Sequence, residues 1–179
     1  RYMPREDRVD HVARLAIKWA GLRRKPNSEK RVAIMLSNYP TKDARIGNAV
    51  GLDTPASVVR LLHALKGAGY HVTGIPENGD ALVHSIVERC SNDQDSLTEE
   101  QLRLAVGHVD ARQYGQWFQD FPDPVKEALP ETWGEPPGQV YRTNGRLAVA
   151  GIDLGNVFVG LQPPRGFGHN PIAIYHSPD

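Results

Sequence analysis

Two glycine-rich loops contain most of the side chains that could hold a ligand. The first loop spans residues 45–57, and the second spans residues 155–168. Their guanidinium, amide and hydroxyl groups, which donate hydrogen bonds to anions, belong to Arg45, Asn48, Thr54, Gln162 and Arg165. Each loop is associated with an apolar run typical of a strand, and ligand crevices of α/β proteins form where loops leave the carboxyl ends of strands. We therefore expect the two loops to be neighbouring walls of one hollow that receives an acidic molecule.

The end of the first loop also has the residues that begin a helix. Asp53 or Thr54 is a candidate N-cap, and Pro55 would stand in the first turn. A helix N-terminus offers free N–H groups to an anion such as a propionate or acetate. Asp53 can instead fill the same donors as the cap, and the loop is then a structural connection between strand and helix.

Glu131 is the leading candidate for a catalytic carboxylate. A carboxylate is a hard ligand for a hydrated divalent cation and also accepts protons. The alternative is a solvated glutamate at a helix end. Trp133, two residues further on, stands beside a turn rather than on an apolar stripe, so it is the better candidate for stacking on a flat ligand.

His169 and His176 are the candidate metal ligands, since imidazole suits transition metals and titrates near neutrality. The alternative for both is a surface or hydrogen-bonded histidine. The sequence has no His-x-x-x-His or Glu-x-x-His pair. We therefore expect any metal to be transient rather than structural.

Hydrophobic periodicity indicates the elements that position these residues. A helix from Pro4 to about Arg23 has one apolar stripe and is expected to dock on a sheet. Residues 31–37 form a continuous apolar run, typical of a strand buried on both faces. A helix beginning near residue 54 and a strand at residues 70–75 would complete a right-handed βαβ unit.

The second half of the chain predicts a lobe and a hairpin. Apolar residues between 91 and 134 recur at helical spacings interrupted by prolines, which indicates a helical insertion. Residues 146–152 and 156–161 predict strands joined by a tight turn, and residues 172–175 predict a final short strand. The expected fold is one α/β domain over residues 1–179, with an open, mostly parallel sheet flanked by helices.

Composition limits the classes of partner. The chain has 179 residues with 21 basic and 21 acidic side chains, so no general attraction to nucleic acid or to an anionic membrane is expected. No apolar run approaches the roughly 18 residues that cross a bilayer. Cys90 is the only cysteine, which excludes an internal disulfide and fits a reducing cytoplasm. The abrupt ends of the chain suggest an excised domain.

Five segments, taken in their order along the chain, together resemble one protein family. They are residues 32–40, 45–57, 75–80, 132–138 and 155–168. They resemble the large subunit of the cobaltochelatases, CobN, which shares ancestry with the porphyrin-binding H subunit of magnesium chelatase. The resemblance covers about residues 30–179, and full-length members are several times longer. Glu131 stands in a stretch similar to one that contains a functional glutamate in the H subunits, although Pro130 replaces an acidic residue there.

The resemblance implies insertion of Co2+, the substrate metal, into hydrogenobyrinic acid a,c-diamide for cobalamin synthesis. It also implies partner subunits of AAA+ type that use ATP and Mg2+. The chain has no Gly-x-x-x-x-Gly-Lys-Ser/Thr loop, so ATP chemistry is expected on those partners. Contacts with the rest of the same large subunit are expected too, and the isolated piece should be inactive.

Three other functions stay open. The chain could be a domain of a magnesium chelatase H-type subunit, which inserts Mg2+ into protoporphyrin IX. It could be a non-catalytic scaffold that docks the ATPase partners or neighbouring domains. Without the resemblance, Gly47 and Gly51 before a helix would weakly indicate a nucleotide-binding α/β domain.

Overall fold

The computed structural model describes residues 3–39, 41–138 and 140–163, with Thr132 and Trp133 described by their backbone alone. Its helices are α1 (Glu6–Arg24), α2 (Thr54–Gly67), α3 (Gly79–Arg89), α4 (Glu99–Leu104), α5 (Ala111–Gln119) and α6 (Asp123–Trp133), with the short 3-10 helices η1 (Asn27–Glu29) and η2 (Asp43–Arg45). Its strands are β1 (Val32–Leu36), β2 (Gly107–Asp110), β3 (Arg142–Thr143), β4 (Arg146–Val149), β5 (Gly151–Asp153) and β6 (Val157–Leu161).

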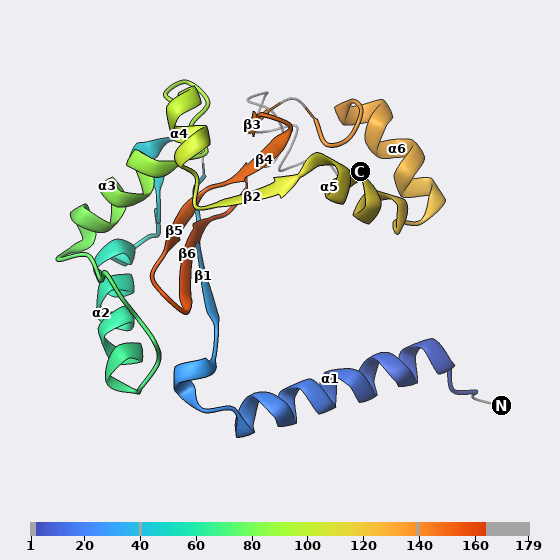
Figure 1. Cartoon of the computed structure of the whole chain (residues 1–179), viewed down its shortest axis with the longest axis horizontal. Helices are drawn as coiled ribbons and strands as arrows, with labels where there is room; N and C mark the ends of the chain where they lie inside the picture. The colour runs from blue at the N-terminus through green and yellow to red at the C-terminus, as the bar shows by residue number, and fades with distance from the viewer. Residues whose placement is uncertain (1–2, 40, 139, 164–179) are drawn as a thin grey trace.

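The first sheet has the strand order β1-β6-β5 and carries the core. β1 and β6 run parallel, with Leu36 aligned to Leu161 at their carboxyl ends. Helices α2 and α3 cover one face, where alternate residues of β6 meet Leu62 and Ile86, all fully or almost fully buried (Figure 1). This alternation is the period of two that a strand with one covered face requires.

The second sheet, β2-β4-β3, is antiparallel and continues the first. Ala150 alone separates β4 from β5, and its carbonyl accepts a hydrogen bond from the Leu161 amide at 3.2 Å. In Figure 1, β4 and β5 form one bent ribbon that leads away from α2 and α3 toward α5 and α6. The ribbon therefore joins the core to a helical lobe.

The expected α/β class is confirmed, but the expectation of a mostly parallel sheet is wrong for the described residues. Of the strand pairs in the described residues, only β1 with β6 is parallel, and the other three are antiparallel. The segment at residues 70–75 forms an isolated bridge, Val72 with Gly155, instead of a strand. Gly74 at φ +61° interrupts the extended backbone, so the predicted βαβ unit is not completed.

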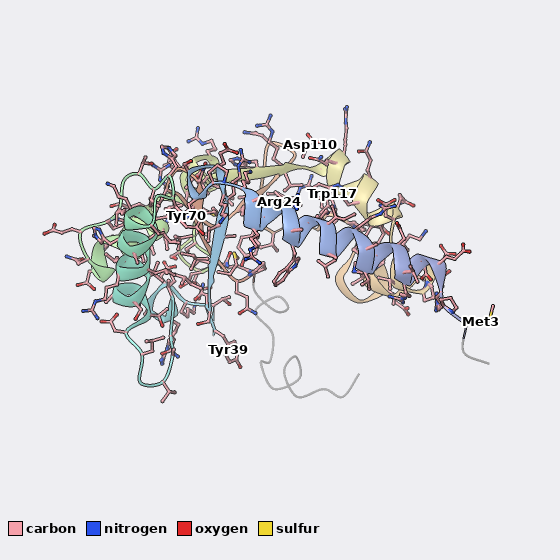
Figure 2. The ribbon with its side chains drawn as sticks, turned by 90° about the horizontal axis from the view of Figure 1, so that it is seen from below. Met3, Arg24, Tyr39, Tyr70, Asp110 and Trp117 are labelled. Atoms are coloured by element: carbon pink, nitrogen blue, oxygen red, sulfur yellow. The ribbon has the colours of Figure 1, made fainter. Side chains whose placement is uncertain are left out.

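Helix α1 forms as predicted but does not dock on a sheet. None of its residues is buried, and Ile17 and Trp19 are 70% and 72% exposed. Figure 1 shows α1 extending away from the sheets, and Figure 2 shows the helix running from Arg24 to its far end near Met3. The sequence pattern identifies an apolar face of α1 that another surface could cover. In the structure, the chain between α1 and β1, which includes η1, leads this helix away from the sheet.

The predicted helical insertion at residues 91–134 contains α4, α5 and α6, and also strand β2. Thr98 begins α4 with a capping box that includes Gln101, as the sequence indicates. Pro124 stands in the first turn of α6, where its missing N–H has no intrahelical role, and Pro130 lies inside the helix. In the described part of the chain, no helix is long and apolar enough to cross a membrane.

Candidate functional site

The segments that follow β1 and β6 begin side by side. The segment after β1, residues 37–53, contains most of the predicted residues 45–57 and is called the first loop from here on, and the segment that begins at Gln162 is called the second loop. Leu36 and Leu161 end the parallel strands β1 and β6 at the same edge of the sheet. The amide of Gln162 donates to the carbonyl of Leu36 at 2.8 Å, which continues the pairing one residue into the second loop. The chain therefore leaves both strands at the same edge of the sheet. Arg165, His169 and the final predicted strand lie outside the described residues, as does His176.

The first loop folds back onto the end of its own strand. The carbonyl of Ser37 accepts a hydrogen bond from the Gly47 amide at 2.7 Å, and the Ser37 hydroxyl donates to the carbonyl of Asn48 at 3.1 Å. Gly47 has φ +70°, and a Cβ there would stand 3.2 Å from the Cβ of Thr54. Glycine thus allows the loop to close over the start of α2.

The three candidate anion-binding residues among residues 45–57 differ in access. Arg45 in η2 and Asn48 after it are both exposed, so their side chains are available to a ligand. The hydroxyl oxygen of Thr54 is buried and has no hydrogen-bond partner among the described residues. Its contact with a substrate stays a prediction.

The N-terminus of α2 is filled by the chain itself. The carboxylate of Asp53 accepts a hydrogen bond from the Ala56 amide at 3.0 Å, and its carbonyl accepts one from the Ser57 hydroxyl at 2.6 Å. Asp53 is therefore the cap, the second of the two possibilities that the sequence left open. A ligand carboxylate at this helix end would have to displace it.

A buried polar segment, Ser91-Asn92-Asp93, connects the two loops. Asp93 is 7% exposed, and its carboxylate accepts hydrogen bonds from the first loop, at 3.1 Å from Lys42 Nζ and 3.2 Å from the Asp43 amide. Asn92 Nδ2 donates to the carbonyl of Gln162 in the second loop at 2.9 Å. The two loops are thus held by adjacent residues of a third segment.

The same contacts set the charges of the loop. Burial raises the pKa of Asp93, but hydrogen bonds from Lys42 and from the amides of Asp43 and Asp95 outweigh it, so the net pKa is below the usual 3.8. Hydrogen bonds to Asp95 and Asp93 raise the pKa of Lys42 above 10.5. Both groups are therefore charged at neutral pH, and the Lys42 ammonium is paired with two carboxylates.

An apolar groove of about 600 Å³ opens between the second sheet and the helical lobe. Its lining is rich in aromatic side chains and is formed by β2, α5, α6, β4 and the chain after α6, and it includes Tyr114, Trp117, Phe118, Leu129, Tyr141 and Pro163. Phe118 is buried and packs edge-to-face on Phe121, with ring centroids 5.9 Å apart. The volume lies in the range of about 300–1,000 Å³ that small-molecule sites occupy.

The groove is connected to the loops through Tyr141 and Pro163. Pro163 directly follows Gln162, so the second loop enters the groove at its first residues. The Tyr141 hydroxyl donates to the carbonyl of Asn92 at 2.9 Å. Burial raises the pKa of this hydroxyl above 10, so it remains a donor at neutral pH. The groove and both loop starts therefore belong to one contiguous region.

Glu131 is exposed on α6, between two residues that line the groove, Leu129 and Gly134. The backbone of Trp133 ends the same helix. The side chain of Gln162 is partly exposed, while its amide and carbonyl are both used in hydrogen bonds. Glu131 thus lies on a helix that borders the groove without lining it, and Gln162 is next in sequence to the lining residue Pro163.

The sequence reasoning did not find Asn92, Asp93, Trp117 or Tyr141. Tyr114 and Phe118 are among the apolar residues whose spacing predicted helices between residues 91 and 134, and they lie on α5, but both line the groove. The signal for Asp93 is weak, because its partners lie about 50 residues away and a polar run resembles a surface loop.

The described residues do not assemble a metal centre. Within residues 3–39, 41–138 and 140–163, no group of three or more His, Cys, Asp and Glu side chains could hold an ion. His84 and His108 use ring nitrogens on backbone carbonyls at 2.8 and 2.9 Å. Burial raises the pKa of Cys90 to about 11, so its thiol stays protonated near neutral pH.

Comparison with known proteins reveals close relatives over the whole chain. The aerobic cobaltochelatase subunit CobN of Pseudomonas aeruginosa is 44% identical over 178 residues, which are 99% of this chain and 14% of that protein. The magnesium-chelatase subunit ChlH of Oryza sativa subsp. indica is 31% identical over 170 residues, which are 95% of this chain and 12% of that protein. The chain therefore spans only a small part of the length of the relatives it matches.

A solved structure and a family model agree with these relatives. The catalytic subunit of cobaltochelatase from Mycobacterium tuberculosis superposes with a TM-score of 0.79 and 38% sequence identity, over 99% of this chain and 14% of that one. The model of the family described as CobN/Magnesium Chelatase matches residues 1–179. On this evidence, the chain belongs to the CobN/magnesium chelatase family.

Proposed function

We propose that this chain forms part of the tetrapyrrole-binding surface of a cobaltochelatase large subunit, which inserts Co2+ into hydrogenobyrinic acid a,c-diamide. The observation that carries the proposal is the apolar, aromatic-lined groove that opens beside the starts of both loops. A tetrapyrrole is a flat apolar ring with acidic side chains. It therefore needs a stacking surface with hydrogen-bond donors at its rim, and Trp117 with Arg45 and Asn48 would supply them.

In this proposal the macrocycle lies in the groove, and its acidic side chains extend toward the loops. Arg45 and Asn48 are exposed and donate to carboxylates, with Gln162 at the edge of the groove. Arg165 and Trp133 are proposed to add a second guanidinium and a second indole. The net charge of the chain is zero, so the recognition of an acidic ring has to come from these local groups.

Metal insertion needs a group that accepts the protons of the ring N–H groups and helps to remove water from the ion. We assign this role to the Glu131 carboxylate, which is exposed on the helix that borders the groove. His169 and His176 remain proposed transient ligands of Co2+. Partner subunits of AAA+ type are proposed to supply the ATP and Mg2+ chemistry, and this chain alone is not expected to insert metal.

The test is an absorbance titration of the complete subunit with hydrogenobyrinic acid a,c-diamide and with a porphyrin. Trp117→Ala should weaken macrocycle binding about tenfold, as loss of one stacked aromatic contact of about 1.4 kcal/mol requires. Trp19→Ala is the matched control, because Trp19 is 72% exposed on α1 and Trp117 is 50% exposed in the groove. Unchanged affinity of Trp117→Ala would contradict the groove as the binding site.

The same titration decides between cobalt and magnesium branches. Tighter binding of hydrogenobyrinic acid a,c-diamide than of the porphyrin is expected, and the reverse order would favour an H-type subunit. The scaffold function is a second candidate, favoured by the uncovered apolar side chains of α1. It predicts that substitutions on α1, and not in the groove, reduce stimulation of the ATPase partners.

A further inference from the structure

We infer that the buried segment Ser91-Asn92-Asp93 positions the two loops against each other and against the groove, with Asp93 as the central positioning residue. The inference rests on the proposed function, since it explains how the proposed substrate-binding groups are held. It concerns residues that contact other parts of the protein and not the substrate.

Asp93 fixes the first loop through backbone and side chain together. Its Oδ2 accepts from the Asp43 amide at 3.2 Å, and its Oδ1 accepts from Lys42 Nζ at 3.1 Å and from the Asp95 amide at 3.2 Å. An ionised carboxylate has two accepting oxygens and no donor, so it can accept these three hydrogen bonds at once. η2, which ends at Arg45, therefore starts from a backbone that Asp93 holds in place.

Asn92 fixes the second loop and the groove in the same way. Its Nδ2 donates to the carbonyl of Gln162 at 2.9 Å, and its carbonyl accepts from the Tyr141 hydroxyl at 2.9 Å. Gln94 Nε2 also donates to the Tyr141 hydroxyl, at 3.3 Å. One residue thus contacts both the edge of the groove and the start of the loop that follows β6.

Ser91 makes the segment rigid. It is fully buried, and its hydroxyl accepts a hydrogen bond from the Asp93 amide at 3.2 Å. All three residues are at least nine-tenths buried, although each is polar. Burial of a polar group costs free energy, and an apolar residue of the same volume would avoid this cost. Buried polar groups are therefore expected where their hydrogen bonds specify a geometry.

The partners of the segment indicate what geometry is specified. Lys42 and Asp43 precede Arg45 in the first loop, Gln162 begins the second loop, and Tyr141 lines the groove. The contacts span 49 to 70 positions of sequence. Removing them would leave the strands paired but would release the relative placement of the donors that surround the groove.

The matched pair of variants is Asp93→Asn and Asp95→Asn in the complete subunit. Both remove a carboxylate that is paired with Lys42, but the side chain of Asp95 is 84% exposed and that of Asp93 is 11% exposed. The Asn amide has an NH₂ group in place of one of the two accepting oxygens. This group would face Lys42 Nζ or the Asp43 amide, which are both donors, so the first loop has to move. Asp95→Asn keeps every hydrogen bond that Asp93 makes to the loop backbone.

Two readouts are needed. In metal insertion assays with the ATPase partners, Asp93→Asn should raise the KM for the tetrapyrrole about tenfold or more, with a smaller change in kcat, because misplaced binding groups weaken binding. Asp95→Asn should stay within about twofold of the wild type. Amide hydrogen exchange at residues 42–48 and at Gln162 should become faster in Asp93→Asn alone, and this holds whatever the ligand is.

The outcomes separate the two proposals. A folded Asp93→Asn subunit with wild-type KM and wild-type amide exchange would overturn the positioning role. If Asp93→Asn does not fold, Asp93→Glu is the second test, because it keeps the negative charge but displaces the accepting oxygens. A wild-type KM together with wild-type amide exchange in Asp93→Glu would again overturn the inference. A wild-type subunit that binds no tetrapyrrole would refute the proposed function, whereas faster exchange in Asp93→Asn would still support positioning of the loops.

Discussion

The carboxylate of Asp93 lies 3.1 Å from the ammonium nitrogen of Lys42, although 51 positions of sequence separate the two residues. The pair joins the loop after β1 to the segment after α3. It is the carboxylate that is buried, since its side chain is 11% exposed and that of Lys42 is 48% exposed. The contact therefore anchors an exposed part of the first loop to the buried carboxylate of Asp93.

Stability should fall in acid partly because of Asp93. Its pKa is lower in the folded chain than the usual 3.8, so the ionised carboxylate stabilises the folded state above that pH. This contribution is lost as pH falls below about 4 through the folded pKa. In urea unfolding at pH values from 7 to 3, Asp93→Asn should therefore show a shallower loss of stability than the wild type. Asp95→Asn is the control, and parallel curves for the wild type and Asp93→Asn would contradict the assignment.

Glu131→Ala should abolish most metal insertion by the complete subunit and leave tetrapyrrole binding measurable. The expected loss is about 100-fold in kcat, within the range for removal of a general base. Glu127→Ala is the matched control, because Glu127 is also an exposed glutamate of α6. Equal rates for Glu131→Ala and the wild type would remove this glutamate from the site.

Gly151 should tolerate substitution less than Gly160, although both lie under the ring of Phe158. At Gly151, with φ +147°, an added Cβ would contact the carbonyl oxygen of Val159 and stand 2.8 Å from the Cα of Gly160, so backbone has to shift. At Gly160 the nearest atoms belong to side chains, those of Phe158 and Met35. Gly151→Ala should lower the free energy of unfolding by about 3 kcal/mol or more, and Gly160→Ala by less.

Urea unfolding of both glycine variants checks this order. Gly115→Ala is the control, since no atom of the described part of the chain lies within 4 Å of its added Cβ and it stands inside α5. It should be neutral or stabilising by about 0.5–1 kcal/mol. A larger loss for Gly160→Ala than for Gly151→Ala would show that the ring of Phe158 is less free to move than the backbone.

Leu62→Ala and Leu22→Ala should differ sharply in stability. Leu62 is fully buried between α2 and the first sheet, so its truncation should cost about 2–5 kcal/mol. Leu22 on α1 is 54% exposed, and the same truncation should change stability by about 0.5 kcal/mol or less. Thermal unfolding of the two variants measures the difference, and comparable losses would mean that α1 is packed in solution.

Local chemistry predicted most elements and the caps of α2 and α4. Each cap is specified by residues within four positions of one another, so no distant contact is needed. These residues are Asp53-Thr54-Pro55 for α2 and Thr98 with Gln101 for α4. Two apolar runs with polar exits predicted two strands, but which strands pair, including the parallel pairing of β1 with β6, became known only from the structure.

The remaining features depend on distant contacts that a local pattern does not contain. The stripe of α1 identified an apolar face, but not whether the chain covers it. The apolar run at residues 31–37 predicted burial on both faces, yet Met35 is 53% exposed, because the described helices cover only one face of the first sheet (Figure 1). Asp93 is specified by partners in loops on other segments, so its burial was not visible in the sequence.

The uncovered position of Trp19 gives the molecule an optical reporter. Trp19 is 72% exposed, and an exposed indole emits fluorescence at long wavelengths. Its emission shifts to shorter wavelengths when another surface displaces the water around it. Fluorescence of Trp19, in a variant that lacks the other two tryptophans, would thus register the moment at which any macromolecule closes over α1.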